Sequence, residues 1–476
     1  MKRILVFFAI LAIGIPSFAH PWKPRHYVII DTDAGLDDMK AITLLLVSPD
    51  VRVVAITVSS GVLNAKSGYL KIKSMLNNCY HEGIPVGINL ACKYKAPDYQ
   101  AAMNANWGDE VIAGKDNPPD FIPLLEQILS VETNDLTMIC LGGLSSASEA
   151  LTEIPQFKQK VKRIVWSSYG LSNKNDFNYN IDTESANNVA KCGIPLTIIN
   201  SEVGASMSFY DDELLKNIGL TSNKYSDMLT RFFSSKSAKS HAYPFTLVDD
   251  AIPIYLHYPQ VFNADTTGNI IEATPGNIDE LRKKFLQIIA GETVERNQVI
   301  KAMPYNPSFY FEDIEPSVGE IIQKYGIDEW TSGVFANELH RHLGVFAIIG
   351  VKMGIRAREY FNTGVDEFMV TSSAGSTPPL SCMNDGLQVS TGATPGHGLL
   401  TVNNENPGPT AVFTYMDKKI RLTLKPELAK MVSDELKEIN FVYGLDSDLY
   451  WELVRKNSIK YWLRLDRHDI FIIEEL

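Results

Sequence analysis

The chain has 476 residues, of which 45% are apolar and 21% are charged, and this composition is typical of a packed globular protein and excludes wholesale disorder. The length accommodates one large domain and a smaller companion. Acidic residues outnumber basic ones by 56 to 44, for a net charge of −12. Because a chain of this charge repels phosphate backbones, we expect no nucleic-acid partner.

Residues 1–19 have the features of a secretory signal peptide: a basic start, an apolar run and small residues before the predicted cleavage site. The apolar run from Ile4 to Pro16 is shorter than the roughly 20 residues that span a bilayer. We therefore expect a periplasmic or secreted protein with no membrane span after removal of the signal peptide. The five cysteines show no CxxC pair and no regular spacing, so they do not indicate a disulfide framework.

The segment 20–330 alternates short apolar runs with helical patterns, which predicts βαβ units and an α/β fold with a mainly parallel sheet flanked by helices. The helical segments between residues 277 and 330 are expected to close this domain. A smaller α+β domain is predicted over residues 333–476. The expected strands of the first domain are YVIID (27–31), VRVVAITV (51–58), LTMICL (136–141), RIVWSS (163–168) and PLTIIN (195–200).

A group of aspartates follows the first predicted strand, where working residues of parallel sheets gather: Asp31, Asp33, Asp37 and Asp38, around Gly35. Carboxylate oxygens suit a hard cation such as Ca²⁺ or Mg²⁺, and export favours Ca²⁺. The structural alternative is a solvated acidic turn, in which Asp37 and Asp38 serve the first turn of the following helix.

Two other chemistries use acidic segments of this kind. An EF-hand loop counted from Asp31 would need Gly at its sixth position and Glu at its twelfth, but Leu36 and Ile42 stand there. An aspartyl-phosphate phosphatase also places Asp-x-Asp after a buried strand. Gly35 stands where such enzymes usually have Thr or Val, and Asp37 and Asp38 have no role in that scheme. The phosphatase stays open as an alternative.

The segment DTDAGLDDMKAI (31–42) resembles the DTDPG-x-DD signature of the inosine/uridine-preferring nucleoside hydrolases. Further segments that are similar to this family follow in the same order: AITVSSG (55–61), LGGLSSASEAL (141–151), DFNYNIDTESAN (176–187) and LVDDAIPIY (247–255). The resemblance implies a nucleoside hydrolase-like fold that binds a small-molecule nucleoside. It also implies Ca²⁺-dependent hydrolysis of the N-glycosidic bond, which releases ribose and the free base.

The same resemblance implies a metal site and a general base. The positions that match the family's Ca²⁺ ligands are Asp33, Asp38, the main-chain carbonyl of Leu141, and Asp250. Asp33 would also take the proton of the attacking water, and the transition state would have oxocarbenium character.

The resemblance also implies substrate contacts. Asp37 and Asn178 would hold ribose hydroxyls, and Asp176 stands where the family commonly has Glu. The usual Asn after the second strand is Val62 here, so we expect Asn64 to replace it. The remaining expectations concern the leaving base: Asp249 occupies the position of a His that assists it, and Trp166, Tyr169 or Tyr243 would supply stacking or hydrogen bonding instead.

The C-terminal part, with ELHRHLGVFAIIGVKMGIRAREYF (338–361) and SCMNDGLQVSTGATPGHGLL (381–400), resembles the FmdE-like domain, which takes its name from formylmethanofuran dehydrogenase. Its candidate ligands for Zn²⁺ or another transition metal are His340, His342, Cys382 and Asp385, with His397 as a further candidate. In the alternative interpretation, these histidines cap a helix and bond the Gly-rich loop without a metal.

The leading hypothesis is therefore a secreted Ca²⁺-dependent nucleoside hydrolase with an accessory C-terminal domain that binds a transition metal. The second hypothesis is a nucleoside- or sugar-binding protein with impaired turnover, which Val62 and Asp249 suggest. A third places the main activity in the C-terminal domain. The nucleobase and the presence of a homo-oligomer are left open.

Overall fold

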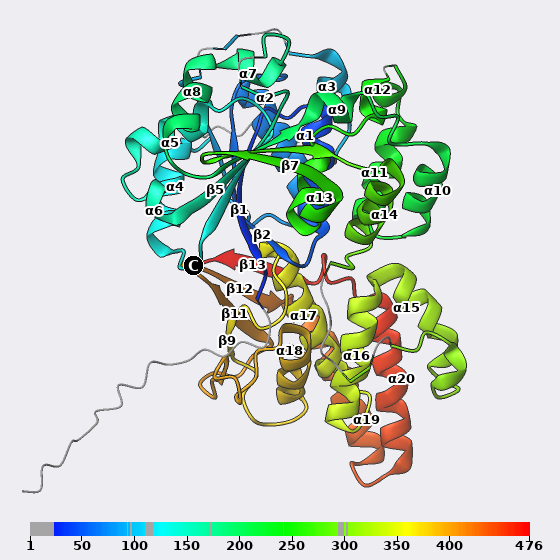
Figure 1. The fold of residues 1–476 in the computed structure, drawn as a ribbon. Coiled ribbons are helices and arrows are strands. Elements are labelled where there is room, and N and C mark those ends of the chain that lie inside the picture. Colours follow the sequence, from blue (N-terminus) through cyan, green and yellow to red (C-terminus); the bar gives the residue numbers. More distant parts are fainter. Residues whose placement is uncertain are drawn as a thin grey trace, which may run out of the picture.

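A computed structural model describes residues 23–476 except 93, 96–97, 110–117, 172, 241, 294–298 and 301–302. The predicted signal peptide lies outside the described residues. Two sheets with separate hydrophobic cores define an N-terminal domain and a smaller C-terminal domain (Figure 1). This arrangement confirms the predicted α/β fold with a smaller second domain.

The first sheet has eight strands in the order β3-β2-β1-β4-β5-β6-β8-β7, and all neighbours are parallel except β7 and β8. Every strand expected from the sequence is present. The strands are β1 (His26–Thr32), β2 (Val51–Val58), β3 (Val86–Ile88), β4 (Leu136–Cys140), β5 (Val161–Ser168), β6 (Leu196–Asn200), β7 (Phe262–Thr267) and β8 (Ile270–Pro275).

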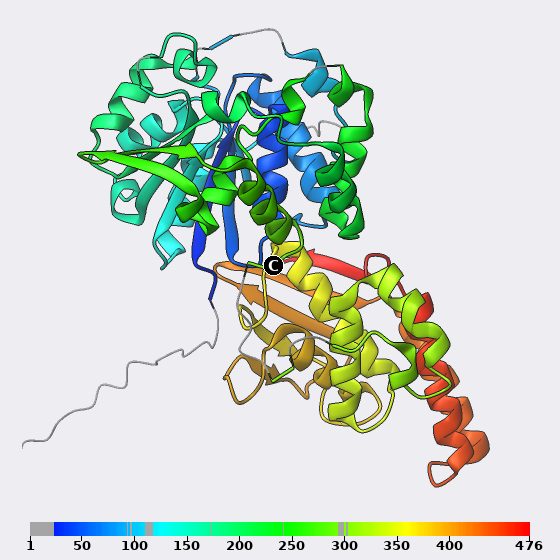
Figure 2. The ribbon, with the colours of Figure 1, turned by 45° about the vertical axis from the view of Figure 1, so that its right-hand side comes forward.

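Helices cover both faces of this sheet, which is why its central strands β1, β2, β4 and β6 are buried along most of their length (Figures 1 and 2). Within β1, Val28 and Ile30 pack into one core and Ile29 into the other. One face carries α1 (Leu36–Val47), α2 (Ala65–Asn78), α10 (Asp212–Leu220), α11 (Lys224–Ser234), α13 (Ala251–His257) and α14 (Ile278–Ile289). The other carries α4 (Phe121–Val131), α5 (Ser145–Glu153), α6 (Phe157–Lys160) and α8 (Thr183–Lys191).

Short helices complete the first domain, and several of them connect the strand ends to the longer helices. They are α3 (Gln100–Asn104), α7 (Phe177–Ile181), α9 (Ser201–Ala205), α12 (Lys236–Lys239), η1 (Tyr243–Phe245) and η2 (Pro259–Val261).

The C-terminal domain is built on a sheet of five strands in the order β10-β9-β11-β12-β13. Its strands are β9 (Met369–Ser372), β10 (Leu400–Val402), β11 (Thr410–Tyr415), β12 (Lys418–Leu424) and β13 (Phe471–Glu475). Its helices are α17 (Val345–Phe361), η5 (Leu380–Cys382), α18 (Met383–Thr391), α19 (Pro426–Tyr443) and α20 (Asp448–Arg464).

The segment between residues 277 and 330 divides between the two domains. Helix α14 packs into the first core as expected, but η3 (Pro307–Phe309), η4 (Glu315–Ser317), α15 (Val318–Tyr325) and α16 (Ile327–His340) lie beside the C-terminal helices (Figure 2). The reason is aromatic packing, because Trp330 stacks on Trp462 at 5.1 Å between ring centroids. Residue 330 therefore lies inside α16, a helix that packs on the C-terminal domain.

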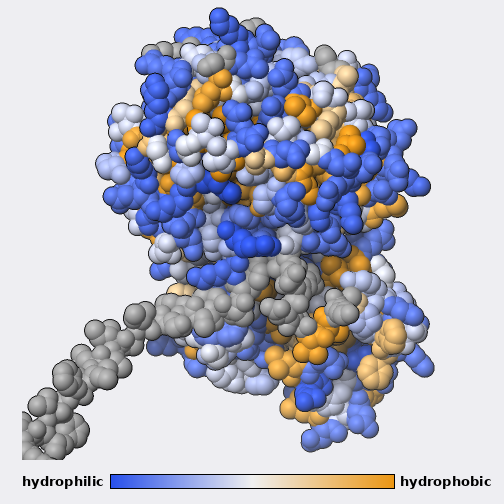
Figure 3. Space-filling model, viewed as in Figure 1, coloured by the Kyte–Doolittle hydropathy of each residue, from blue (hydrophilic) through white to orange (hydrophobic). Residues whose placement is uncertain are grey.

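The domains meet through buried polar contacts. Arg52 of β2 forms an ion pair with Glu367 at 2.6 Å, and Tyr80 stacks on His468 with 3.5 Å between ring centroids. Apolar residues on the face shown in Figure 3 form separate groups among polar ones. Among the described residues, no helix combines the length and apolar character that crossing a bilayer requires.

Candidate functional site: a buried carboxylate cluster

The predicted aspartates lie where β1 ends and α1 begins. Ala34 adopts a left-handed conformation with φ of 60°, so the chain turns sharply between Asp33 and the first turn of α1. The Asp38 Oδ2 atom accepts hydrogen bonds from Thr32 Oγ1 at 2.6 Å and from the Asp33 main-chain nitrogen at 3.1 Å. The turn therefore holds Asp38 against Asp33.

Glycines make room for the Asp33 carboxylate. A Cβ atom on Gly61, which follows β2, would lie 2.0 Å from Asp33 Oδ2, and one on Gly142, which follows β4, would lie 3.2 Å from it. A Cβ on Gly35 would lie 2.8 Å from Asp38 Oδ1, 2.9 Å from Asp37 Oδ1 and 3.5 Å from Asp33 Oδ1. The three carboxylates thus crowd around Gly35 at the carboxyl ends of the central strands.

Asp249 brings a fourth carboxylate to this place from the segment before α13. One oxygen atom each from Asp37, Asp38 and Asp249 lies within 4.8 Å of the other two, and all three residues are buried. We call Asp33, Asp37, Asp38 and Asp249 the carboxylate cluster.

The four carboxylates of the cluster lie close together in a buried place, where like charges repel one another. Burial, and then the charges of neighbouring carboxylates, raise the pKa of Asp38 to about 7 and hold the pKa values of Asp33 and Asp249 well above the usual range. Asp33 Oδ2 and both Asp249 oxygens are buried without a hydrogen-bond donor among the described residues. Oxygen atoms of this kind fit a hard divalent cation.

The structure corrects the expectation for Asp250. Its Oδ2 atom lies 2.7 Å from Lys40 Nζ and accepts a hydrogen bond from Tyr210 at 2.7 Å. Because a fully buried ammonium group already neutralises this carboxylate, Asp250 does not belong to the cluster. Asp249 occupies the place in the cluster that was predicted for Asp250. The residue before Asp249 is the apolar Val248.

Asp31 lies behind the cluster and is fully buried. Its Oδ1 atom accepts a hydrogen bond from Thr57 at 2.6 Å, and its Oδ2 atom accepts one from Ser59 at 3.1 Å. Because hydroxyl groups engage both of its carboxylate oxygens, the structure does not favour Asp31 as the nucleophile of the aspartyl-phosphate alternative.

Leu141, Asn178 and Asp176 lie at the ends of β4 and β5. The Leu141 carbonyl accepts a hydrogen bond from Asn178 Nδ2 at 2.7 Å, and the same amide donates to the Ser167 carbonyl at 3.0 Å. Asp176 caps α7 and accepts hydrogen bonds from Ser168 Oγ and from main-chain nitrogens. In this arrangement Asn178 is oriented by two strand ends, and Asp176 holds the loop that carries it.

Two predicted substrate contacts are wrong. Asn64 is exposed, caps α2, and donates from Nδ2 to Asp98 at 2.8 Å, so its side chain is engaged away from the cluster. Trp166 belongs to β5, and its side chain is fully buried in the core on one face of the sheet, where Nε1 donates to the Gly142 carbonyl at 2.9 Å. A ring with no exposed surface cannot stack on a base.

Tyr243 does reach the site. Its hydroxyl hydrogen-bonds to Asp37 Oδ2, and its ring belongs to η1, which precedes the Asp249 segment. Tyr169 is half-buried, and its main-chain nitrogen donates to Asp176. Of the aromatic residues expected near the leaving base, Tyr243 therefore has a direct contact with the carboxylate cluster.

The C-terminal candidates come together in part. His340 Nδ1 lies 2.7 Å from Asp385 Oδ2, and the rings of His340 and His342 are 4.1 Å apart. Hydrogen bonding to Asp385, with the nearby Cys382 thiol, raises the pKa of His340 to about 9. His397 lies apart, because its Nδ1 atom contacts Asp366 at 3.3 Å and the Gly392 carbonyl at 3.1 Å.

The sequence analysis missed Lys40, and it assigned to Asp250 the place in the cluster that Asp249 occupies. A signal for Lys40 was present, because a lysine within the apolar helix segment MKAITLLL needs a buried anion opposite it. No comparable signal separates two consecutive aspartates, since only the packing of α13 decides which one faces the cluster.

Comparison with known proteins matches each of the two domains to a protein family. A family model described as inosine-uridine preferring nucleoside hydrolase matches residues 28–306, and one described as FmdE, molybdenum formylmethanofuran dehydrogenase operon, matches residues 339–441. The chain is 30% identical over 207 residues to the pyrimidine-specific ribonucleoside hydrolase RihA of Escherichia coli O7:K1, which covers 40% of this chain and 66% of that protein, slightly less than two thirds.

Two more distant matches have related names. Uridine nucleosidase 1 of Arabidopsis thaliana is 24% identical over 254 residues, which is 50% of this chain and 73% of that protein. A solved purine-preferring ribonucleoside hydrolase from Gardnerella vaginalis is 17% identical, with a TM-score of 0.47 over 56% of this chain and 99% of that one.

Proposed function

We propose that this chain, which belongs to the inosine-uridine preferring nucleoside hydrolase family, hydrolyses the N-glycosidic bond of ribonucleosides to ribose and free base. The observation that carries the proposal is the carboxylate cluster at the carboxyl ends of the central strands, with buried oxygens to which no group in the described part of the chain donates a hydrogen bond. Ligand sites of open α/β sheets lie at this edge.

The metal expected in such a site is Ca²⁺. Asp33, Asp38, Asp249 and the Leu141 carbonyl would hold it, which replaces the Asp250 of the sequence prediction. When bound, a cation of this kind supplies positive charge that makes a nearby water more acidic.

The protein groups then have distinct roles in the proposed reaction. Asp33 Oδ2, to which no described residue donates a hydrogen bond, takes a proton from the water that attacks the anomeric carbon. Asp37 accepts hydrogen bonds from ribose hydroxyls, and Asn178 Oδ1 is oriented for the same task because its Nδ2 atom is bound to two carbonyls. Hydrogen bonds to the sugar help as the bond to the base breaks with oxocarbenium character.

The test is a reducing-sugar assay over a panel of purine and pyrimidine ribonucleosides with Ca²⁺. We expect ribose release that stops when a chelator is added, returns with Ca²⁺, and is lost in Asp33→Asn. The matched control is Asp434→Asn, a change in a surface carboxylate of α19, which leaves the rate unchanged. No ribose release from any nucleoside by the Ca²⁺-loaded chain would contradict the proposal.

A nucleoside-binding protein with impaired turnover is the second candidate. One reason is Val248, an apolar residue that directly precedes Asp249, where part of the family has a His that assists the leaving base. Another is the hydrogen bond of the Tyr243 hydroxyl to Asp37, which occupies a carboxylate oxygen proposed to bind ribose. Calorimetry separates the two, because tight ribonucleoside binding without ribose release identifies the binder.

Three further proposals accompany this function. The composition of residues 1–19 supports export to a periplasmic or extracellular space. The packing of α14 in the first core, and of α15 and α16 against the C-terminal helices, supports a domain boundary between α14 and α15 rather than the predicted one at residue 330. The contact of His340 with Asp385 beside His342 and Cys382 supports a transition-metal site in the C-terminal domain. Metal analysis of a His340→Ala variant against the unaltered chain tests that site.

A further inference from the structure

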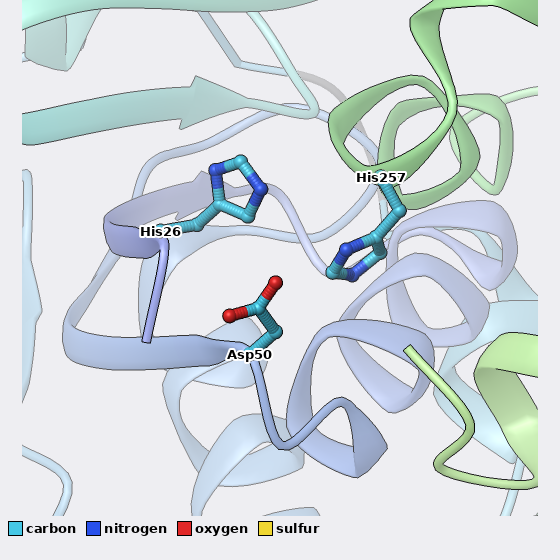
Figure 4. A group of neighbouring side chains, drawn as sticks. All are labelled: His26, Asp50 and His257. Carbon is cyan, nitrogen blue, oxygen red and sulfur yellow. The ribbon is translucent and has the colours of Figure 1, made fainter. Parts of the chain in front are cut away.

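A second group of metal-ligating side chains lies at the amino edge of the first sheet, opposite the carboxylate cluster. His26 begins β1, Asp50 precedes β2, and His257 ends α13. One ligand atom from each lies within 4.8 Å of the other two, and Figure 4 shows the three side chains pointing toward one another. We propose that these three residues, the His26 cluster, bind a divalent transition metal ion of the Zn²⁺ class.

The ligand types decide the class of metal. Two imidazoles and one carboxylate suit borderline ions such as Zn²⁺, whereas Ca²⁺ takes oxygen ligands. His26 and His257 are half-buried and Asp50 is buried, and a neutral imidazole presents a lone pair from its unprotonated nitrogen. The His26 cluster therefore differs in chemistry from the all-oxygen carboxylate cluster.

The surroundings of His257 match those of a metal-binding histidine. Its Nε2 atom lies 3.0 Å from Ser48 Oγ, which in turn lies 3.1 Å from Thr293 Oγ1. Its Nδ1 atom is buried without a hydrogen-bond partner in the described part of the chain. When Nε2 carries the proton and donates it to Ser48, Nδ1 presents its lone pair to the cluster. Metal-ligating histidines commonly use their other nitrogen in this way.

Asp50 supplies the negative charge of the cluster, and a surface arginine neutralises it. Its carboxylate is 1% exposed and lies 2.5 Å from Arg25 Nε, whereas the Arg25 side chain is 63% exposed. The main-chain nitrogen of Arg25 also donates to Asp50 Oδ1 at 2.8 Å. The guanidinium group can turn into solvent while this main-chain bond keeps the carboxylate in place. Arg25 is therefore a competitor of the metal for Asp50.

The position of the cluster suggests a structural role for the metal. β1 begins at His26 and is followed by Asp33, so the two sites lie about 20 Å apart along the strand. α13 ends at His257 and follows Asp249 closely. A metal at the His26 cluster would connect the far ends of two elements that carry the carboxylates. Because it binds the folded chain, it would raise the thermal unfolding midpoint.

The experiment uses the full chain with Asp38→Asn and His340→Ala as the parent, so that neither of the other candidate sites binds strongly. Co²⁺ is added as a spectroscopic probe for Zn²⁺, and its visible absorption is titrated. We expect one equivalent to bind, with Zn²⁺ displacing it and raising the unfolding midpoint. His26→Gln and His257→Gln should each weaken binding at least about tenfold, because lost hydrogen-bond partners of ligands already cost about 10- to 100-fold.

Two further variants make the result specific. His397→Gln, a change in an exposed histidine of the other domain, should leave Co²⁺ affinity unchanged. Arg25→Gln should tighten binding several-fold because it removes the competing cation, and equal or weaker binding would overturn the assignment of Asp50. The proposal as a whole is overturned if the parent binds no Co²⁺, or if a His257→Gln variant with native circular dichroism binds it as tightly as the parent. These readouts do not depend on nucleoside hydrolysis.

Discussion

Lys40 Nζ lies 2.7 Å from Asp250 Oδ2, and both side chains are completely buried. The same ammonium group donates to the carbonyls of Pro244 at 3.1 Å and Thr246 at 3.2 Å. Lys40 stands two positions after Asp38 on α1, and Asp250 directly follows Asp249. The ion pair therefore ties together the two segments that carry the carboxylate cluster.

We expect Lys40→Met to lower the free energy of unfolding by about 3 to 5 kcal/mol, because it leaves the Asp250 charge buried and unpaired. Denaturant unfolding measures the loss, and adding Asp250→Ala should restore part of it. The surface variant Lys456→Met, whose partner Glu452 is exposed, should cost less than about 1 kcal/mol. Equal losses in Lys40→Met and Lys456→Met would contradict the structural role of the pair.

Asp249→Asn and Asp250→Asn should separate metal binding from stability. Calorimetry with Ca²⁺ should show binding lost in Asp249→Asn and retained in Asp250→Asn. Without metal, Asp249→Asn should stabilise the fold because it removes one of several like charges, whereas Asp250→Asn should destabilise it by weakening the bond to Lys40. Loss of Ca²⁺ binding in Asp250→Asn alone would restore the ligand assignment made from sequence.

Gly61→Ala should impair catalysis, because the added Cβ would lie 2.0 Å from Asp33 Oδ2 and 2.7 Å from Asp33 Cβ. The general base must move, and a displacement of about 1 Å costs on the order of 100-fold in rate. The measurement is kcat/KM for the best nucleoside of the panel. Gly319→Ala in α15 is the matched control, since a Cβ there meets no described atom within 4 Å apart from the backbone of its own helix. Equal activity of both variants would argue against Asp33 as the base.

His81 should make the stability of the folded chain depend on pH. Its Nε2 atom lies 2.6 Å from Tyr225 Oη and its Nδ1 atom 2.5 Å from the Glu359 carbonyl of the C-terminal domain. Burial, with the nearby Lys224 charge, holds its pKa well below 6.5. The unfolded state therefore binds the extra proton first as pH falls below about 6.5, and stability is lost in that range.

The comparison that isolates this effect is the unaltered chain against His81→Gln, with the free energy of unfolding measured from pH 7.5 to 5. The difference between the two should shrink toward acid pH by up to about 1.4 kcal/mol per pH unit, the value for one proton. Parallel profiles for the two proteins would show that His81 is not the titrating group.

The sequence predicted the part of the carboxylate site whose residues lie in one short segment. Asp33, Asp37 and Asp38 follow a buried strand within a single turn, so their convergence follows from local chain geometry. The substrate contacts predicted for Asn64 and Trp166 were wrong because the position of a residue in the sequence does not determine which way its side chain points. A helix cap engages the first, and the core encloses the second.

The order of apolar runs and acidic residues along this chain is sufficient to specify a parallel α/β sheet with an oxygen-rich site at its carboxyl edge, because strand burial and turn chemistry are local properties. Packing alone selects Asp249 over Asp250, assigns Asp250 to Lys40, and draws His26, Asp50 and His257 together. The contacts of Lys40 with Asp250 and of Ser48 with His257 join segments 210 and 209 residues apart. Their geometry depends on how helices pack on the sheet rather than on any nearby stretch of sequence.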